Sequence, residues 1–275
     1  MCAYKGIDVS EWQGDIDFTK VKNSGIDFVM ARASYGMTAE DECWRQNVYN
    51  AHHAGLHVGA YHFVYATDVS SAKTNADKFL RTLSNFKGKV DYPVACDFEY
   101  DSIKYMRSAG IEPSVKRVEE IVRTFCDRVE KAGYYTMLYT NQDFLNNYFY
   151  NIDEYDIWYA LWTDTPVDTH NMVQYADDGR ISGVRGNVDL DVSYIDYATL
   201  IKKCGLNYLS QAVESNTIHV GDKVKVINPI NYDNSHNFTC WYDVYDVIQI
   251  DGNRVVIGIG KTVTSAIDIH NIKKV

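Results

Sequence analysis

The sequence has no long apolar run and no apolar stretch of the signal-peptide type near its first residues. A membrane-spanning helix needs about 20 predominantly apolar residues, so we expect neither a membrane anchor nor a secretory leader. Positive charge is also scarce, since 27 Lys and Arg residues stand against 37 Asp and Glu and leave a formal net charge of −10. Because nucleic acids are held mainly through their phosphates by basic residues, we expect no nucleic-acid partner.

Closely spaced cysteines and metal-ligand motifs are absent as well. The six cysteines are scattered without a C-x-x-C pair, which predicts free, reduced thiols in a chain made in the cytoplasm. Neither H-x-E nor H-E-x-x-H occurs, and the adjacent His52 and His53 would diverge by about 100° on a helix. We therefore expect no metal site and no cofactor.

The chain does contain two acids that follow a short apolar run, in Val94-Ala95-Cys96-Asp97-Phe98-Glu99. Residues i and i+2 of a strand point to the same side, so Asp97 and Glu99 would project together. Two neighbouring acids in an apolar setting repel each other when both are ionised, and one pKa should rise. A raised carboxyl beside an ionised one suits acid–base cleavage of a glycosidic bond. The alternative, a strand end whose acids face water, stays open on this motif alone.

Strand-like and helix-like segments alternate from residue 3 to about residue 204. We expect strands at 4–10, 26–33, 57–64, 94–97, 136–140, 157–162 and 172–175, and helices within 41–54, 72–83, 115–132 and 193–203. This alternation predicts an α/β fold whose parallel sheet forms a closed or nearly closed, TIM-like barrel. The site of such a barrel lies at the C-terminal ends of its strands. There the chain places Asp8, Arg32, Tyr61, Asp97, Glu99, Tyr139 and Trp162.

The character of the sequence changes near residue 205. We expect a barrel domain at 1–205, a linker at 206–216 and a small all-β domain at 217–275. In the last segment the helical period is absent, and Asp251-Gly252-Asn253 is typical of a tight hairpin turn. The candidates for its apolar core are Val224, Val226, Val255, Ile257 and Ile259. The aromatic residues Trp241, Tyr242 and Tyr245 are interpreted first as hairpin packing, with a ligand platform as the alternative.

Seven motifs occur in an order that is typical of one enzyme family. They are Gly6-Ile7-Asp8-Val9-Ser10-x-Trp12-Gln13-Gly14, Gly59-Ala60-Tyr61-His62-Phe63, Asp97-Phe98-Glu99, Leu138-Tyr139-Thr140-Asn141, Trp158-Tyr159-Ala160, Val173-Gln174-Tyr175 and Val188-Asp189-Leu190-Asp191. Residues 3–203 thereby resemble family 25 of the glycoside hydrolases. The resemblance implies an irregular β/α barrel and a lysozyme (N-acetylmuramidase) that cuts the β-1,4 bond after N-acetylmuramic acid in peptidoglycan.

The resemblance also implies roles for individual residues. Glu99 matches the general acid of the family, Asp97 the carboxylate beside it, and Asp8 a further acid of the pocket. The substrate-binding candidates are Asp189, Tyr61, Tyr139, Trp162 and Gln174. For Trp162, as for Trp12 and Trp158, stacking on a sugar and packing in the core remain equal alternatives.

Two positions depart from the pattern of the family. Many members read Lys-Ala-Thr-Glu-Gly where this chain has Arg32-Ala33-Ser34-Tyr35-Gly36, so the contribution of that glutamate is absent. The family often has Asn where Asp191 stands, which adds one charge near the pocket. Neither departure affects the pair of Asp97 and Glu99.

Three mechanisms are compatible with this pair of acids. Carboxylates about 5–5.5 Å apart indicate a covalent retaining route and carboxylates about 6.5–9.5 Å apart an inverting one. In a third route the 2-acetamido group of the substrate is the nucleophile. We favour this third route, with Glu99 as the acid and Asp97 orienting the acetamido group.

Two other functions compete with the muramidase. A chitinase-like hydrolase would usually bring a longer D-x-x-D-x-D-x-E run, whereas only Val94-Ala95-Cys96 precede Asp97 here. A non-catalytic glycan-binding barrel would have no need to keep all four acids, Asp8, Asp97, Glu99 and Asp189.

Residues 217–275 resemble a bacterial SH3-type wall-binding module through Val220-Gly221-Asp222-Lys223-Val224 and the hairpin turn. A muramidase joined to such a module without a signal peptide has the layout of a phage endolysin. The resemblance implies synthesis in the host cytoplasm, action at the cell wall and bacterial peptidoglycan as the partner. The target species, the wall ligand, a phage or bacterial origin and the oligomeric state stay open.

Overall fold

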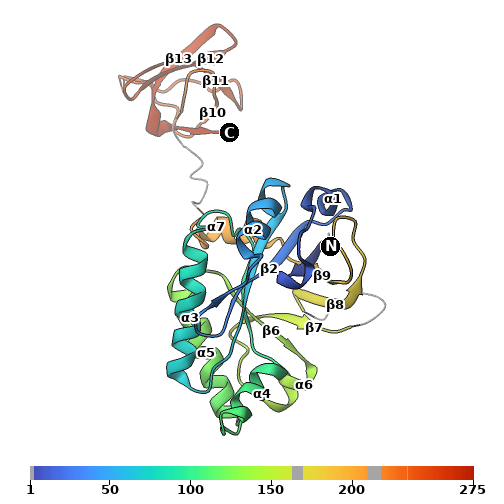
Figure 1. Cartoon of the computed structure of the whole chain (residues 1–275). Coiled ribbons are helices and arrows are strands. Elements are labelled where there is room, and N and C mark those ends of the chain that lie inside the picture. Colours follow the sequence, from blue (N-terminus) through green and yellow to red (C-terminus); the bar gives the residue numbers. More distant parts are fainter. Residues whose placement is uncertain (1–2, 163–169, 210–217, 234) are drawn as a thin grey trace. The chain divides into compact units, whose positions relative to one another are not determined.

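The structure, a computed structural model, describes residues 3–162, 170–209, 218–233 and 235–275. The chain divides into two compact units, Met1–Gln211 and Ala212–Val275 (Figure 1). The strands of the first unit are β1 (Tyr4–Val9), β2 (Phe28–Tyr35), β3 (Ala39–Glu40), β4 (His57–Phe63), β5 (Val94–Asp97), β6 (Thr136–Asn141), β7 (Asp156–Ala160), β8 (Met172–Gly179) and β9 (Val188–Ser193). Its helices are η1 (Glu11–Gln13), α1 (Phe18–Asn23), α2 (Trp44–His53), α3 (Val69–Ser84), α4 (Tyr100–Ser108), α5 (Val115–Lys131), α6 (Gln142–Asn147) and α7 (Tyr197–Cys204).

Eight of the nine strands form a closed barrel in the order β1-β9-β8-β7-β6-β5-β4-β2, and the pairing of β1 with β2 closes it. The predicted mixed α/β barrel is thus confirmed. The prediction of a parallel sheet is wrong at one strand of the barrel, because β9 runs antiparallel to both β8 and β1; outside the barrel, the short β3 is antiparallel to β2. Only residues 180–187 connect β8 to β9. A parallel pair needs a crossover of about a dozen residues or more, so this short connection returns the chain in the opposite direction.

The predicted helices are present where the sequence has a strong apolar stripe of helical period. In α5 the residues Val118, Ile121, Val122, Phe125 and Val129 are buried as predicted, and the Ser114 side chain accepts a hydrogen bond from the backbone of Arg117. The short helices α1, α4 and α6 were not predicted, because six to nine residues with few apolar positions show no clear period. Within the described ranges no helix is both long and apolar enough to cross a lipid bilayer.

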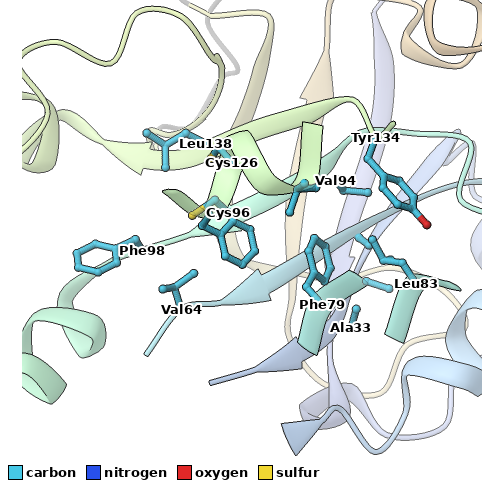
Figure 2. Packing of buried hydrophobic residues seen from close by; sticks show 14 of the residues in the cluster. Ala33, Val64, Phe79, Leu83, Val94, Cys96, Phe98, Cys126, Tyr134 and Leu138 are labelled. Atoms are coloured by element: carbon cyan, nitrogen blue, oxygen red, sulfur yellow. The ribbon is translucent and has the colours of Figure 1, made fainter. Parts of the chain in front are cut away.

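The strand β5 shows how the barrel separates its packing from its chemistry. Val94 and Cys96 face outward and are fully buried in the layer between the strands and the helices α3 and α5 (Figure 2). Phe79 and Leu83 of α3 belong to the same layer, and truncating such a buried Phe to Ala costs about 3–5 kcal/mol. Because side chains alternate along a strand, Ala95 and Asp97 face the barrel interior.

The interior is filled with apolar side chains at the amino-terminal ends of the strands. The rings of Phe28 and Tyr92 stack with their centroids 4.5 Å apart and belong to one buried cluster with Met30 and Met137. Only glycine fits at position 6, since a Cβ atom at this position would overlap the Phe28 ring. This end of the barrel is therefore a packed core.

Residues 206–209, which the sequence analysis assigns to the linker, lie against this end of the barrel. Asn207 has a left-handed backbone, with φ of 54°, and its side chain is fully buried. It accepts a hydrogen bond from the backbone of Tyr135 and donates to the carbonyls of Val90 and Tyr92. The rest of the expected linker, 210–216, lies outside the described residues.

The second unit is a five-stranded antiparallel sheet in the order β13-β12-β11-β10-β14. Its elements are β10 (Lys223–Val226), β11 (Tyr245–Asp251), β12 (Arg254–Ile259), β13 (Thr262–Asp268), η2 (Ile269–Asn271) and β14 (Ile272–Lys274). The predicted hairpin turn is present, because Asp251 pairs with Arg254 across Gly252 and Asn253. Val224, Val255 and Ile257 are buried as predicted. Ile259, the last residue of β12, is 39% exposed, in contrast to the prediction.

Candidate active site

The carboxyl-terminal ends of parallel barrel strands, together with the amino-terminal end of the antiparallel β9, surround a cavity of about 630 Å³. Acidic and aromatic side chains dominate its wall, and Arg32 is the one basic residue among the described residues that line it. The lining residues are Asp8, Ser10, Glu11, Trp12, Gln13, Arg32, Tyr35, Tyr61, Phe63, Tyr65, Asp97, Glu99, Asp101, Tyr139, Trp158, Gln174 and Asp189. No group of three or more His, Cys, Asp or Glu residues suited to a metal ion occurs in the described part of the chain.

Asp97 and Glu99 occupy the junction between β5 and α4. Asp97 is the last residue of the strand, and Glu99 keeps an extended backbone, with φ of −138° and ψ of −158°, as the N-cap of α4. Phe98 between them points into the core and is fully buried. The backbone N–H of Glu99 donates to the Ser102 hydroxyl over 3.2 Å, and that hydroxyl donates to the Val64 carbonyl over 2.7 Å. The alternation of the strand thus continues for two residues, and both acids line the cavity.

The electrostatic setting favours the protonated forms of both acids. Burial raises the pKa of Asp97 well above its usual value, the Glu99 charge raises it further, and Arg32 opposes the shift. Burial also raises the pKa of Glu99 to about 7, with Asp101 adding to the shift and Lys104 opposing it. One oxygen of Asp97, Oδ1, is buried without a hydrogen-bond partner among the described residues.

Gln174 on β8 connects several groups of the cavity wall. Its side-chain Nε2 donates to Asp8 Oδ2 over 2.8 Å. Its Oε1 accepts two hydrogen bonds, from the Tyr139 hydroxyl at 2.8 Å and from the Trp162 indole at 3.1 Å. Because both ends of the amide are engaged, Gln174 fixes the position of the Asp8 carboxylate.

Two further acids come from the antiparallel strand β9. Asp189 pairs in register with Asp8 on β1, and Asp191 pairs with Gln174 on β8. Burial raises the pKa of Asp189 to about 6, against the effect of its hydrogen bond with Asp8. Burial raises the pKa of Asp8 well above its usual value, and the charges of Asp191 and Asp189 add to this. The reversal of β9 therefore brings three aspartates together at one side of the barrel interior.

Aromatic rings form much of the remaining wall. The Trp158 ring meets Tyr139 and Tyr61 edge to face, with centroids 4.8 and 5.9 Å apart. Trp12 also lines the cavity but is 79% exposed. Aromatic rings at the wall of a cavity are suited to packing against the apolar face of a sugar ring.

A charged network beside the cavity was missed by sequence reasoning. The Arg32 guanidinium donates to Asp41 over 2.8 Å and to Glu11 over 2.7 Å, and the backbone of Glu11 donates to Asp41 over 3.0 Å. These residues lie 9 to 30 positions apart in the sequence and share no motif. The one available signal was the position of Arg32 near the end of β2.

The structure brings all but one of the predicted site residues to the cavity wall. Asp8, Asp97, Glu99, Asp189, Tyr61, Tyr139 and Gln174 line it. Trp162 is not a lining residue and is 60% exposed, and it contacts the site through its hydrogen bond to Gln174.

Comparison with known proteins gives a family for most of the first unit. The profile of the family described as glycosyl hydrolases family 25 matches residues 7–184. An autolytic lysozyme of Clostridium acetobutylicum is 30% identical over 191 residues, which cover 68% of this chain and 55% of that protein. The chain thus spans about half the length of this relative.

Two solved structures share the fold. A bacterial lysozyme from Streptomyces coelicolor matches with a TM-score of 0.61 at 26% identity, covering 76% of this chain and 100% of that one. The CTP1L endolysin matches with a TM-score of 0.60 at 26% identity, covering 72% of this chain and 69% of the other.

Proposed function

Because the chain belongs to family 25 of the glycosyl hydrolases, we propose that it cleaves the β-1,4 bond between N-acetylmuramic acid and N-acetylglucosamine in bacterial peptidoglycan. The observation that carries this proposal is Glu99, whose pKa is raised to about 7 beside Asp97 in the cavity. A glycosidase needs an acid that is still protonated near neutral pH. The names of the related lysozymes and of the endolysin support peptidoglycan as the substrate.

In the proposed reaction Glu99 donates its proton to the glycosidic oxygen as the bond from this oxygen to C1 breaks. The carbonyl oxygen of the 2-acetamido group bonds to C1 and forms a cyclic oxazolinium ion. The Glu99 carboxylate then takes a proton from a water molecule, whose oxygen attacks C1 and reopens the ring. Both steps return Glu99 to its starting state and consume one water molecule for each bond cleaved.

Asp97 has the task of holding the acetamido group. The pKa values of both acids are raised, whereas the reaction needs an anionic Asp97 and a protonated Glu99. An amide N–H that donates to a carboxylate stabilises its charged form. Binding of the acetamido N–H at Asp97 therefore lowers the pKa of Asp97, so that Asp97 becomes the anion while Glu99 keeps its proton.

The remaining residues of the cavity bind and orient the sugar. Asp8 is held by Gln174, and in our proposal it accepts hydrogen bonds from the substrate together with Asp189. Tyr61 and Tyr139 offer aromatic rings at the cavity wall, and Trp162 donates a hydrogen bond to Gln174. Their task is to exclude water and to fix the ring for proton transfer.

Mass spectrometry of the products from purified cell walls tests the reaction. We expect new reducing ends on muramic acid, and none from a Glu99→Gln variant measured in parallel. Reducing ends on glucosamine would indicate a different glycosidase, and cleavage of chitin in place of peptidoglycan would favour the chitinase-like alternative. Binding of wall fragments without any product from the wild-type chain would favour a glycan-binding barrel.

The route through the acetamido group has its own test. No sugar should become attached to Asp97 at any stage of this route. A slow substrate that leaves a glycosyl adduct on Asp97, seen by mass spectrometry of the intact protein, would replace it with the covalent retaining route.

We also propose that the second unit is an SH3-type module that binds the bacterial wall. Its support is a five-stranded sheet with its own buried core, in a compact unit separate from the barrel. Trp241 and Tyr242 are 78% and 55% exposed, which favours a ligand platform over the packing role expected for them. Tethering to the wall would raise the local concentration of the barrel without changing its site, and it places the action of the protein at the cell wall.

A fluorescent fusion of residues 212–275 tests this role. We expect it to label cells that the full chain lyses, and to lose labelling when Trp241 and Tyr242 are both changed to Ala. A fusion shown to be folded by its circular dichroism that labels none of those cells would contradict the binding role.

A further inference from the structure

Asp191 is the most deeply buried of the three aspartates at the side of the barrel formed by β1, β8 and β9. Its side chain is 0% exposed, compared with 5% for Asp8, and it does not line the cavity. It sits opposite Gly6 of β1 and Gln174 of β8. A substrate in the cavity therefore meets Asp8 and Asp189, with Asp191 behind them.

The hydrogen bonds around Asp191 leave one of its oxygens without a donor. Oδ1 accepts a hydrogen bond of 2.8 Å from the Trp158 indole. Oδ2 is buried and has no partner among the described residues. Among the described residues, the side-chain hydrogen bonds of Gln174 go to Asp8, Tyr139 and Trp162, and none of them reaches Oδ2 of Asp191.

The charges around Asp191 give no compensation either. The groups that face it are the acids Asp8 on β1 and Asp189 on β9, the neutral Trp158 on β7 and Gln174 on β8, and Tyr175, which follows Gln174. Arg32, the one basic residue among the described residues that line the cavity, is engaged by Asp41 and Glu11. An unpaired buried charge is strongly unfavourable, and such a group takes up a proton instead.

A carboxyl group can hydrogen-bond a second carboxylate only when one of the two carries a proton. Asp191 is within hydrogen-bonding reach of Asp8, and Asp8 is already held as an acceptor by Gln174. We propose that Asp191 keeps its proton in the working enzyme and donates it in a hydrogen bond to Asp8, as a positioning residue that fixes the Asp8 carboxylate at the cavity wall. The positioning role rests on the proposed function of the cavity, whereas the protonation of Asp191 does not.

The direction of the pKa agrees with this geometry. Burial raises the pKa of Asp191 well above its usual value and the charge of Asp189 raises it further, whereas the hydrogen bonds with Trp158 and with Asp8 oppose the rise. The proton then compensates the orphan oxygen and removes one of three like charges. A neutral Asp191 behind Asp8 removes one of the two negative charges that raise the pKa of Asp8.

The protonation is tested on the full chain without reference to activity. Aspartate labelled with 13C at the carboxyl carbon gives one NMR signal that is missing in the Asp191→Asn variant and thereby belongs to Asp191. We expect this signal at the position of a protonated carboxyl, unchanged between pH 5 and pH 8. A signal at the carboxylate position, or one that titrates within this range, would overturn the proposal.

The positioning role is tested by kinetics on soluble wall fragments. Asp191→Asn keeps a neutral donor toward Asp8, so we expect kcat within about threefold of wild type and both limbs of the pH profile in place. Asp191→Leu removes the donor, and we expect a loss of about tenfold or more in kcat with little change in KM. Limbs that move to lower pH in Asp191→Asn would show that a negative charge had been removed and would overturn the proposal, even if Asp191→Leu does not fold.

These results separate the two levels of the argument. If the wild-type chain releases no reducing ends from peptidoglycan, the proposed function fails, and the NMR signal still decides whether Asp191 carries a proton. If the chain is active but the Asp191 signal is that of a carboxylate, only the inference about Asp191 fails.

Discussion

The two ends of the barrel differ in the hydrogen-bond donors that they offer to a carboxylate. At the amino-terminal ends of the strands, Asp156 accepts hydrogen bonds from the hydroxyls of Tyr135 and Tyr197 and from the Asn171 side chain. At the other end, Asp97 and Asp191 each keep one buried oxygen without a partner in the described residues. The same fold can therefore surround an acid with donors, and it does not do so at the cavity.

The difference shows where the barrel gives up stability for a function. Unsatisfied buried carboxyls are costly, and they carry the raised pKa values that acid catalysis requires. A satisfied acid such as Asp156 holds neighbouring strands and loops together. The contrast between Asp156 and the cavity acids can be tested by making matched acid-to-amide substitutions at both ends of the barrel.

The largest expected effect is the loss of activity in Glu99→Gln. Removing a general acid typically costs 10²–10⁴ in rate, or about 3–5 kcal/mol of barrier. The matched change at the other end, Asp156→Asn, should leave kcat within a few-fold of wild type when folded. Release of reducing ends measures both, and near wild-type rates in a folded Glu99→Gln protein would remove Glu99 from its role.

The next effect concerns pH. Since the pKa of Glu99 is raised to about 7 and the acid acts in its protonated form, kcat/KM should fall as the pH rises through about 7, by up to tenfold per pH unit. A series from pH 5 to pH 9 on soluble wall fragments reports the pKa of the free enzyme. A decline centred near pH 4.5, the ordinary value of a glutamate, would contradict the proposed environment.

A smaller effect is expected on the free energy of unfolding, and its sign should differ between the two ends of the barrel. The raised pKa of Asp97 means that its contribution to stability is complete below the pKa of the unfolded chain, near 4, and is lost as the pH rises. Asp97→Asn removes this loss and should raise the free energy of unfolding by about 1–3 kcal/mol at pH 8, with little change near pH 4. Asp156→Asn should lower it by about 1–3 kcal/mol, since donors lose their acceptor.

Thermal unfolding at the two pH values measures these changes, and about 1 kcal/mol corresponds to roughly 2–4 °C for a domain of this size. A destabilised Asp97→Asn protein at pH 8 would show that the two ends of the barrel do not differ as we describe.

The smallest effects come from the charges around Glu99. Asp101 raises its pKa and Lys104 lowers it, and the two side chains form an exposed ion pair of 2.7 Å. Lys104→Met should move the alkaline limb up by a few tenths of a pH unit, and Asp101→Asn should move it down by a similar amount. Equal shifts in one direction for both variants would contradict this assignment.

How far the sequence predicts the site depends on how local each signal is. The alternation of side chains along a strand predicts that Asp97 and Glu99 face the cavity and that Cys96 faces the core, as the structure shows. This alternation depends only on adjacent residues and can therefore be predicted from the sequence. The direction of β9 depends on the short connection before it, although Val188-Asp189-Leu190-Asp191 already alternates like a half-buried strand.

The network of Arg32, Glu11 and Asp41 could not be predicted, because it arises from tertiary contacts between separate elements. The same holds for the partners of Gln174, which come from β1, from β6 and from the segment after β7. These elements come together only when the barrel closes, and the hydrophobic periodicity of the sequence does not show which strands will pair to close it.

Asn207 has a consequence for anyone who exchanges modules between proteins of this kind. Composition suggests a seam after residue 205, but Asn207 bonds to three backbone groups in the segments that lead into β5 and β6, and its own N–H donates to the Gly133 carbonyl. A chimera joined before this residue would leave those backbone groups without the hydrogen-bond partner that Asn207 supplies. The practical cut point is set by one amide side chain, and the barrel should be carried whole through residue 209.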